Sequence, residues 1–127
     1  MNVDLARHLL RARDLADGRY AEPLDVAALA ARAHVSPTHF ARCFRAAYGT
    51  TPHQYLVARR MERACFLLRE SDRTVTDVSL DVGFRSLGSF SATFSRWLGV
   101  SPSAYREGAQ PSRIPSCMRK VVFEKRS

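Results

Sequence analysis

The sequence predicts an all-α fold of seven helices, and three observations support this prediction. Apolar residues recur at three- and four-residue spacing along most of the chain, as on the buried face of a helix. Ser-Pro or Thr-Pro pairs, which begin helices, occur at Ser36, Thr51 and Ser101. Glycines that can end helices follow at suitable distances, and no strand pattern occurs before residue 119.

The first two helices are expected over residues 4–17 and 25–33. Gly18 is expected to close the first helix, and Asp25 is a plausible N-cap of the second. The inner face of the first helix is formed by Leu5, Leu9, Ala12 and Ala16.

The third helix is expected to begin at Ser36-Pro37 and to end at Gly49, with Phe40 and Phe44 facing inward. A long fourth helix follows from Pro52 to about residue 70. Its expected apolar face consists of Tyr55, Leu56, Met61, Ala64, Cys65 and Leu68.

The last three helices are shorter. They are expected over residues 75–82, from the cap Ser86 to Gly99, and from Ser101 to Tyr105. The predicted organisation is an N-terminal subdomain (1–50), a linker helix (51–71), a C-terminal subdomain (72–108) and a basic tail (109–127). For the tail, a DNA-trailing arm, a short strand at 121–123 and disorder all remain open.

An internal repeat relates the two subdomains. The matched pairs are Ser36 and Ser86, Phe40 and Phe90, Phe44 and Phe94, Gly49 and Gly99, Pro52 and Pro102, and Tyr55 and Tyr105. Upstream of Ser36 the offset falls by one, so the second turn is longer by Arg85. Each copy predicts a helix, a short turn and a longer helix, which is the outline of a helix-turn-helix. His34 and Gly83 should take a left-handed conformation in the two turns.

The composition favours a polyanionic partner. The net charge is +8 and the isoelectric point is near 10.3, which usually indicates nucleic acid, although an inert basic surface has the same composition. Cys43, Cys65 and Cys117 are odd in number and widely spaced, which argues against a disulfide framework or a zinc knuckle. No apolar run reaches the roughly 18 residues of a membrane helix, so no membrane contact is expected.

Three blocks of sequence resemble the AraC/XylS family of bacterial transcription regulators. They are YAEPLDVAALA at 20–30, VSPTHFARCF at 35–44 with GTTPHQY at 49–55, and DVGF at 81–84 with GVSPSAYR at 99–106. The resemblance covers about residues 5–107. It implies seven helices, binding to two successive major-groove segments of double-stranded DNA as a monomer, and activation through contact with RNA polymerase.

The N-terminus lacks a secretory signal, so a cytoplasmic protein is expected, and DNA binding would associate it with the nucleoid. No Ser/His/Asp constellation or phosphate-binding loop occurs, so no enzymatic activity is expected. No cofactor, metal or small-molecule ligand is expected within the chain. The initial Met and the first helix favour a stand-alone regulator. A DNA-binding fragment of a larger ligand-responsive regulator and a protein-interaction adaptor without DNA binding remain alternatives.

Candidate DNA contacts lie on the exposed faces of the two longer repeat helices. In the first copy they are Ser36, Thr38, His39, Ala41, Arg42 and Arg45. Arg42 is the expected main base reader, with a phosphate contact as the alternative. In the second copy they are Arg85, Ser86, Leu87, Gly88, Ser89, Ser91, Ala92, Ser95 and Arg96. Because this face carries mostly short or apolar side chains, we expect it to contact phosphates, to make apolar contacts with thymine methyl groups and to read DNA shape.

Other signals carry weaker predictions. Arg59, Arg60 and Arg63 on the linker could contact phosphate or form a solvated helix face. His39 and Cys43 lie one helical turn apart, but Cys43 is expected to point at the core, which disfavours metal binding. Cys65 and Cys117 are expected to be a buried residue and a tail residue without redox function.

Overall fold

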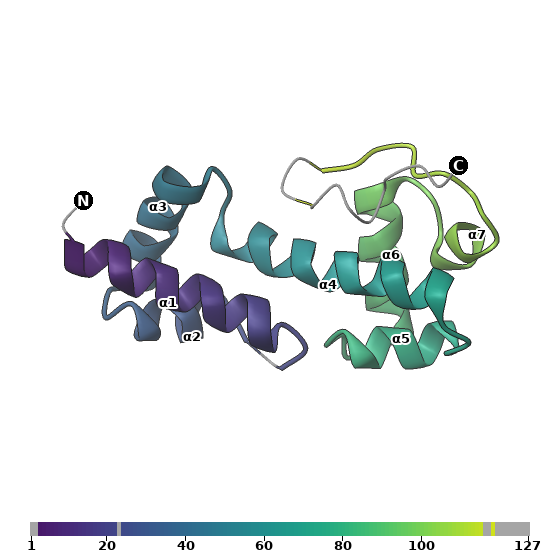
Figure 1. Cartoon of the computed structure of the whole chain (residues 1–127), viewed down its shortest axis with the longest axis horizontal. Coiled ribbons are helices and arrows are strands. Elements are labelled where there is room, and N and C mark those ends of the chain that lie inside the picture. Colours follow the sequence, from purple (N-terminus) through teal and green to yellow (C-terminus); the bar gives the residue numbers. More distant parts are fainter. Residues whose placement is uncertain (1–2, 23, 116–117, 119–127) are drawn as a thin grey trace. The chain divides into compact units, whose positions relative to one another are not determined.

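The computed structural model describes residues 3–22, 24–115 and 118. The regular elements of its described part are all helices, which confirms the predicted all-α fold (Figure 1). The helices are α1 (Val3–Arg19), α2 (Val26–Arg32), α3 (Pro37–Tyr48), α4 (Pro52–Glu70), α5 (Val75–Asp81), α6 (Leu87–Leu98) and α7 (Pro102–Arg106). Among the described residues, no helix is long and apolar enough to cross a membrane.

The chain forms two compact units, residues 1–59 and 60–127, and the boundary falls within helix α4. In the first unit, α1, α2, α3 and the start of α4 enclose one hydrophobic core. Its buried residues are Leu9, Ala12, Ala16, Leu29, Ala30, Ala33, Phe40, Phe44 and Leu56. A hydrogen bond of 2.6 Å from the Tyr55 hydroxyl to Asp17 connects α4 with α1.

The second unit contains the remainder of α4 and helices α5, α6 and α7. Its larger buried side chains are Met61, Cys65, Leu68, Val78, Val82, Phe90, Phe94, Leu98 and Tyr105. The Arg106 side chain donates hydrogen bonds to the carbonyl oxygens of Leu68, Ser71 and Arg73. These bonds satisfy carbonyls that the end of α4 and the following turn would otherwise leave without partners.

The sequence repeat is also a repeat of ring packing. In α3 the Phe40 and Phe44 rings are 5.6 Å apart at 50°, and in α6 the corresponding Phe90 and Phe94 rings are 5.7 Å apart at 49°. A tyrosine extends the packing in the same way in both units. The Tyr55 ring lies 5.6 Å from that of Phe44, and the Tyr105 ring lies 5.7 Å from that of Phe94. Both units therefore use one aromatic scaffold to hold their longer helix.

The prediction for the end of the first helix was wrong. Helix α1 continues through Gly18 to Arg19, and Gly18 does not have the positive φ of a helix-ending glycine. The chain leaves the helix in the next turn, where the Glu22 amide donates to the Arg19 carbonyl oxygen at 3.0 Å. Glycine remains compatible with a helix interior at a modest cost in stability.

The segment after α7 packs on the second unit as far as it is described. The Ser112 amide donates to the carbonyl oxygen of Leu98 at 2.9 Å, and Arg69 donates to that of Ala109 at 2.8 Å. Met118 is also buried. The predictions for Cys117 and for residues 119–127 lie outside the described residues and stay predictions.

Candidate nucleic-acid interface

Helix α3 has a capped N-terminus and a capped C-terminus. The Ser36 hydroxyl accepts a 3.2 Å hydrogen bond from the His39 amide, and Pro37 occupies the first helical position. Gly49 ends the helix with a left-handed φ of 76°. These features confirm the predicted helix start and end. Because Phe40 and Phe44 are fully buried, the rotation of the helix about its axis is defined.

The turns before the two longer helices have the predicted left-handed residue. His34 has a φ of 59° and Gly83 a φ of 96°. Each turn is closed by a backbone hydrogen bond, from Val35 to Ala30 in the first unit and from Phe84 to Ser79 in the second. The left-handed conformation predicted at His34 and at Gly83 is thus confirmed.

The predicted contact residues of α3 form one exposed face. Ala41 is half-buried, whereas the others are exposed: Ser36, Thr38, His39, Arg42 and Arg45. The helix contains no Asp or Glu. A face with two guanidinium groups and no carboxylate suits a polyanion, because nothing on the helix repels phosphate.

Helix α6 presents the corresponding face with fewer charges. Ser86 caps it by accepting a 3.1 Å hydrogen bond from the Ser89 amide, and Phe90 and Phe94 are buried. Ser91 and Ser95 are half-buried, whereas the exposed residues are Leu87, Gly88, Ser89, Ala92 and Arg96. Like α3, α6 has no acidic residue, and Arg96 is its basic residue.

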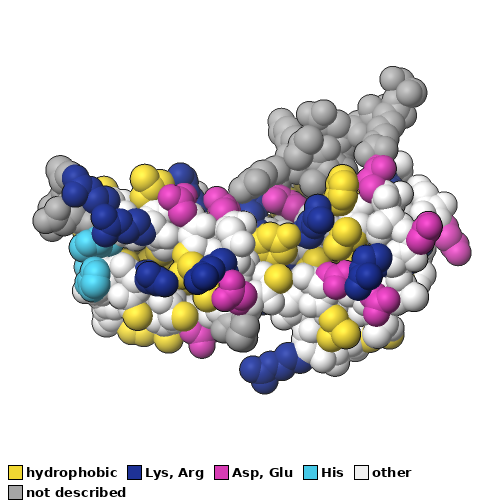
Figure 2. All heavy atoms as spheres, turned by 60° about the horizontal axis from the view of Figure 1, so that its bottom comes forward, with side chains coloured by type: hydrophobic (Ala, Val, Ile, Leu, Met, Phe, Trp, Pro, Cys, Tyr) yellow, Lys and Arg dark blue, Asp and Glu magenta, His cyan; other side chains and the backbone are white. Residues whose placement is uncertain are grey.

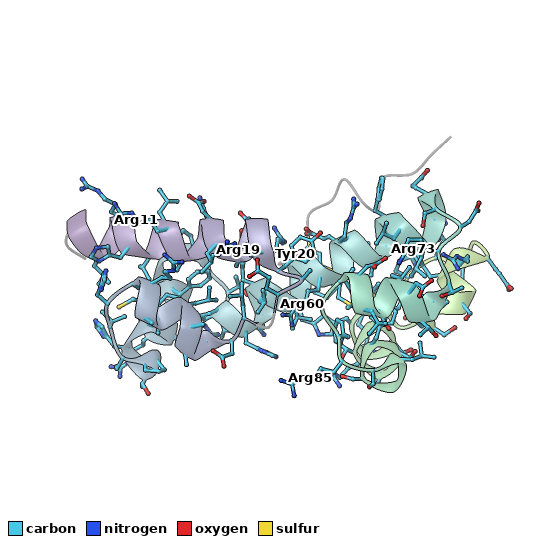
Figure 3. The ribbon with its side chains drawn as sticks, turned by 90° about the horizontal axis from the view of Figure 1, so that it is seen from below. Arg11, Arg19, Tyr20, Arg60, Arg73 and Arg85 are labelled. Carbon is cyan, nitrogen blue, oxygen red and sulfur yellow. The ribbon has the colours of Figure 1, made fainter. Side chains whose placement is uncertain are left out.

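Arg85 occupies the extra position of the second turn, directly before the Ser86 cap. Its side chain is exposed and extends away from the ribbon of the second unit (Figure 3). A long cation beside the amides of a helix N-terminus adds to the positive potential that those amides already create.

The alternative of a solvated face for the linker arginines was wrong for Arg59. Arg59 is only 6% exposed, and its guanidinium carbon lies 4.7 Å from the centre of the Tyr55 ring. Arg60 is half-buried above Phe84, and desolvation lowers its pKa. Arg63 is exposed, which agrees with both predicted alternatives, a phosphate contact and a solvated position. Arg59 thus contacts a ring one turn earlier on α4, whereas Arg60 contacts a ring that is distant in the sequence.

Cys43 is half-buried and packs against the core of the first unit, as predicted. Its sulfur also lies 3.5 Å from His39 Nε2. The pair still offers two groups to a metal, and tetrahedral protein sites use three or four. Across the described residues, no group of three or more His, Cys, Asp or Glu side chains could hold a metal ion.

Comparison with known proteins places this pair of units in a family. Residues 29–108 match a helix-turn-helix domain family of the AraC type. The chain belongs to the AraC family of transcription regulators. It is 40% identical to the MmsAB operon regulatory protein of Pseudomonas aeruginosa over 84 residues, which are 66% of this chain and 27% of that protein. The LumQ regulator of Photobacterium leiognathi is 35% identical over 65% of this chain and 34% of its own length. The chain thus spans about a third or less of these relatives.

Solved structures of this AraC family agree with the fold. The DNA-binding domain of AdpA, determined in complex with a target DNA, has a TM-score of 0.75 and 40% identity. That match covers 79% of this chain and 90% of the AdpA domain. The C-terminal domain of the response regulator AraT from Geobacillus stearothermophilus has a TM-score of 0.78 and 26% identity, over 88% of this chain and 93% of that domain. The family is one of regulators and not of enzymes.

Proposed function

We propose that this chain binds double-stranded DNA in a sequence-specific way, with α3 and α6 entering successive major-groove segments. The observation that carries the proposal is that both units repeat one arrangement, a capped helix held by buried rings with an exposed, acid-free face. The AdpA domain, which has this fold and was solved in complex with a target DNA, supports the same role here.

Within this proposal the two helices have different tasks. Arg42 is exposed near the middle of α3, where a planar guanidinium can bond to both acceptors of a guanine edge. The face of α6 offers Leu87, Gly88 and Ala92 at comparable positions, and these side chains have no hydrogen-bonding group. The second unit therefore holds the phosphate backbone through Arg85, Arg96 and the amides at the start of α6.

The length of α4 supports two contacts on one duplex. Its 19 residues extend about 28 Å at ~1.5 Å per residue. Successive major-groove segments on one side of B-DNA recur about every 34 Å. The length of α4 is therefore of the same order as that spacing. We also propose that residues 1–50 and 72–108 are the two DNA-binding subdomains and that residues 51–71 are the linker helix.

The regulatory consequence is activation of transcription through contact with RNA polymerase. Membership of a family of transcription regulators supports regulation, and a chain bound as a monomer leaves surfaces of both units available to the polymerase. The competing hypothesis is an adaptor that keeps the fold and does not bind DNA.

Selection of bound sequences from a random duplex pool tests the proposal. We expect enrichment of a motif with two segments about one helical turn apart, and a defined shift in gel electrophoresis. Recovery of unselected sequences, or no binding at low salt, would contradict the proposal and favour the adaptor. In vitro transcription from the selected site, with and without the protein, then distinguishes activation from repression.

A further inference from the structure

The first unit contains a basic groove that the proposed DNA contacts do not use. It has a volume of about 560 Å³, within the ~300–1,000 Å³ range of clefts that hold ligands. One wall is the side of α1 that carries Arg11, Asp14, Leu15 and Arg19, and the other is the end of α2 with Ala31, Arg32 and His34. Figure 3 marks Arg11 and Arg19 along α1. We call this feature the α1–α2 groove.

Positive charge dominates the α1–α2 groove. Three guanidinium groups, those of Arg11, Arg19 and Arg32, face a single carboxylate, that of Asp14. Arg19 also forms an ion pair of 3.1 Å with Glu22, but both side chains are more than half exposed, so the pair is weak. Figure 2 shows histidine side chains beside basic side chains on this unit. The lining therefore favours a ligand with several negative charges.

The wall formed by the end of α2 is held in place. His34 has a left-handed φ of 59°, and its ring meets the ring of His8 on α1 at 4.8 Å in an edge-on arrangement. Leu29 and Ala30 of α2 are buried in the core that α1 covers. The groove is thus a property of the folded unit and not of a loose loop.

The groove is lined by none of the predicted DNA contacts of α3. Helix α1 covers the core with Leu9 and Ala12, and α3 meets the same core with Phe40 and Phe44. Arg42 of α3 is exposed and does not line the groove. We therefore expect the α3 face to stay accessible when a partner occupies the groove.

We propose that the α1–α2 groove docks an acidic peptide segment of a protein partner. A peptide with several carboxylates can engage the three guanidinium groups at once, and each planar fork suits a carboxylate. A single small anion in so open and exposed a site would gain little, because water and salt screen it. Leu15, a half-buried residue of the α1 wall, offers an apolar contact that a peptide side chain can use.

Fluorescence anisotropy with the full chain and a labelled Glu-rich peptide containing one Leu tests this inference. Arg11→Gln and Arg32→Gln should each weaken peptide binding by about two- to fivefold, and the double variant by about tenfold. Arg7→Gln is the matched control, because Arg7 is an exposed arginine of α1 that does not line the groove. It should change the affinity less than twofold, and a Lys-rich peptide of the same length should not bind.

A duplex arm separates this inference from the proposed function. The same variants should bind the selected DNA site alike, since Arg7, Arg11 and Arg32 each remove one positive charge when replaced by Gln. Equal peptide affinities in all variants would overturn the inference. A loss of DNA affinity in the groove variants but not in Arg7→Gln would also overturn it, because DNA phosphates would then occupy the groove. Full competition for peptide binding by succinate, at equal carboxylate concentration, would overturn it as well. Absence of DNA binding by the unaltered chain would instead contradict the proposed function.

Discussion

At the scale of single residues, the two arginines of α3 differ in their position along the helix. Arg42 lies near the middle and Arg45 in the last turn, and both are exposed. If the N-terminal half of α3 enters the major groove of DNA, only Arg42 reaches base edges, while Arg45 reaches the phosphate backbone.

Replacement of Arg42 should therefore change specificity, and replacement of Arg45 should not. We expect Arg42→Ala to cost about 1–3 kcal/mol on the selected site and to remove the preference at one base position. Arg45→Ala should weaken selected and random duplexes alike and lower the slope of log affinity against log salt by about one. Anisotropy titrations at several salt concentrations measure both. Equal effects of the two changes on specificity would contradict the assignment.

Cys65 carries a prediction about pH. Burial raises the pKa of its thiol to about 12, although a hydrogen bond with Tyr105 and the charge of Arg69 act in the opposite direction. The unfolded chain ionises this thiol near its ordinary value of 9.0, whereas the folded chain keeps it neutral. Its contribution to stability is thus present below pH 9 and decreases as the pH rises toward 12.

We expect the free energy of unfolding of the unaltered chain to decrease more steeply over this pH range than that of Cys65→Ala. The difference should approach about 1.4 kcal/mol per pH unit. Urea titrations of both proteins measure it, and the variant also serves as the control for tyrosines that ionise in the same range. Parallel curves would show that the thiol is not kept neutral by burial.

Single residues also mark how far sequence alone reaches. The helix caps were predicted correctly, because a cap depends on a few neighbouring residues. They are Ser36 and Gly49 of α3 and Ser86 and Gly99 of α6. The burial of Arg59 was missed, because a basic residue on a helix looks solvated until the elements around it are known.

At the scale of elements, the two glycines that end α3 and α6 form a natural comparison. Both are left-handed, with φ values of 76° and 75°, yet only Gly99 has a neighbour in the way of a side chain. A Cβ at Gly99 would overlap the Ser112 hydroxyl, whereas one at Gly49 would meet nothing within 4 Å.

Gly49→Ala should cost about 1–2 kcal/mol, the cost of an L-residue in this conformation. Gly99→Ala should cost more, because the segment at Ser112 must also move while its amide is bonded to Leu98. Ser112→Gly should recover the excess in a double-mutant cycle of urea stability. Equal costs at the two glycines, or no recovery, would show that the segment yields freely.

The end of α4 depends on one side chain from another element. Arg106 of α7 donates to three carbonyl groups at this end, and one of these bonds, to Leu68, measures 2.8 Å. Its loss leaves partly buried acceptors without a charged donor.

We expect Arg106→Ala to lower the free energy of unfolding by about 2–3 kcal/mol, given ~1.5–3 kcal/mol for a hydrogen bond to a charged group. Arg113→Ala removes the same charge from an exposed position and should change stability by no more than about 0.5 kcal/mol. Thermal or urea unfolding checks both. A small effect of Arg106→Ala would mean that water replaces the guanidinium at these carbonyls.

Elements beyond local signals were harder to predict. Periodicity and caps identified seven helices, but neither indicates which side chain of α7 reaches the end of α4. The α1–α2 groove likewise arises only when two helices pack, so the sequence alone did not identify Arg11 and Arg32 as site residues. The packing of residues 109–115 was missed because that segment has no periodicity.

At the scale of the whole molecule, the two repeated units have similar scaffolds and unequal surfaces. The ring packing of the two units agrees within 0.1 Å between the centroids of the paired phenylalanines, at 5.6 and 5.7 Å. Their exposed faces differ, because α3 carries Arg42 and Arg45 whereas α6 carries Arg96 alone among basic residues. Selection for a fold keeps buried positions similar, while the exposed positions are free to diverge.

This inequality predicts unequal reading of the two DNA segments. Substitution of each base pair of the selected site should cost about 1–3 kcal/mol at positions under α3. Under α6 the costs should be smaller and should follow the stiffness of the base steps, since phosphate contacts and DNA shape carry no direct base code. Ala92→Arg should add a base preference to the second segment, whereas Ala46→Arg, at an exposed position in the last turns of α3, should only raise affinity at all sequences. Steep and equal costs across both segments would mean that short side chains on α6 read base edges directly, and the division of labour between the two units would then be wrong.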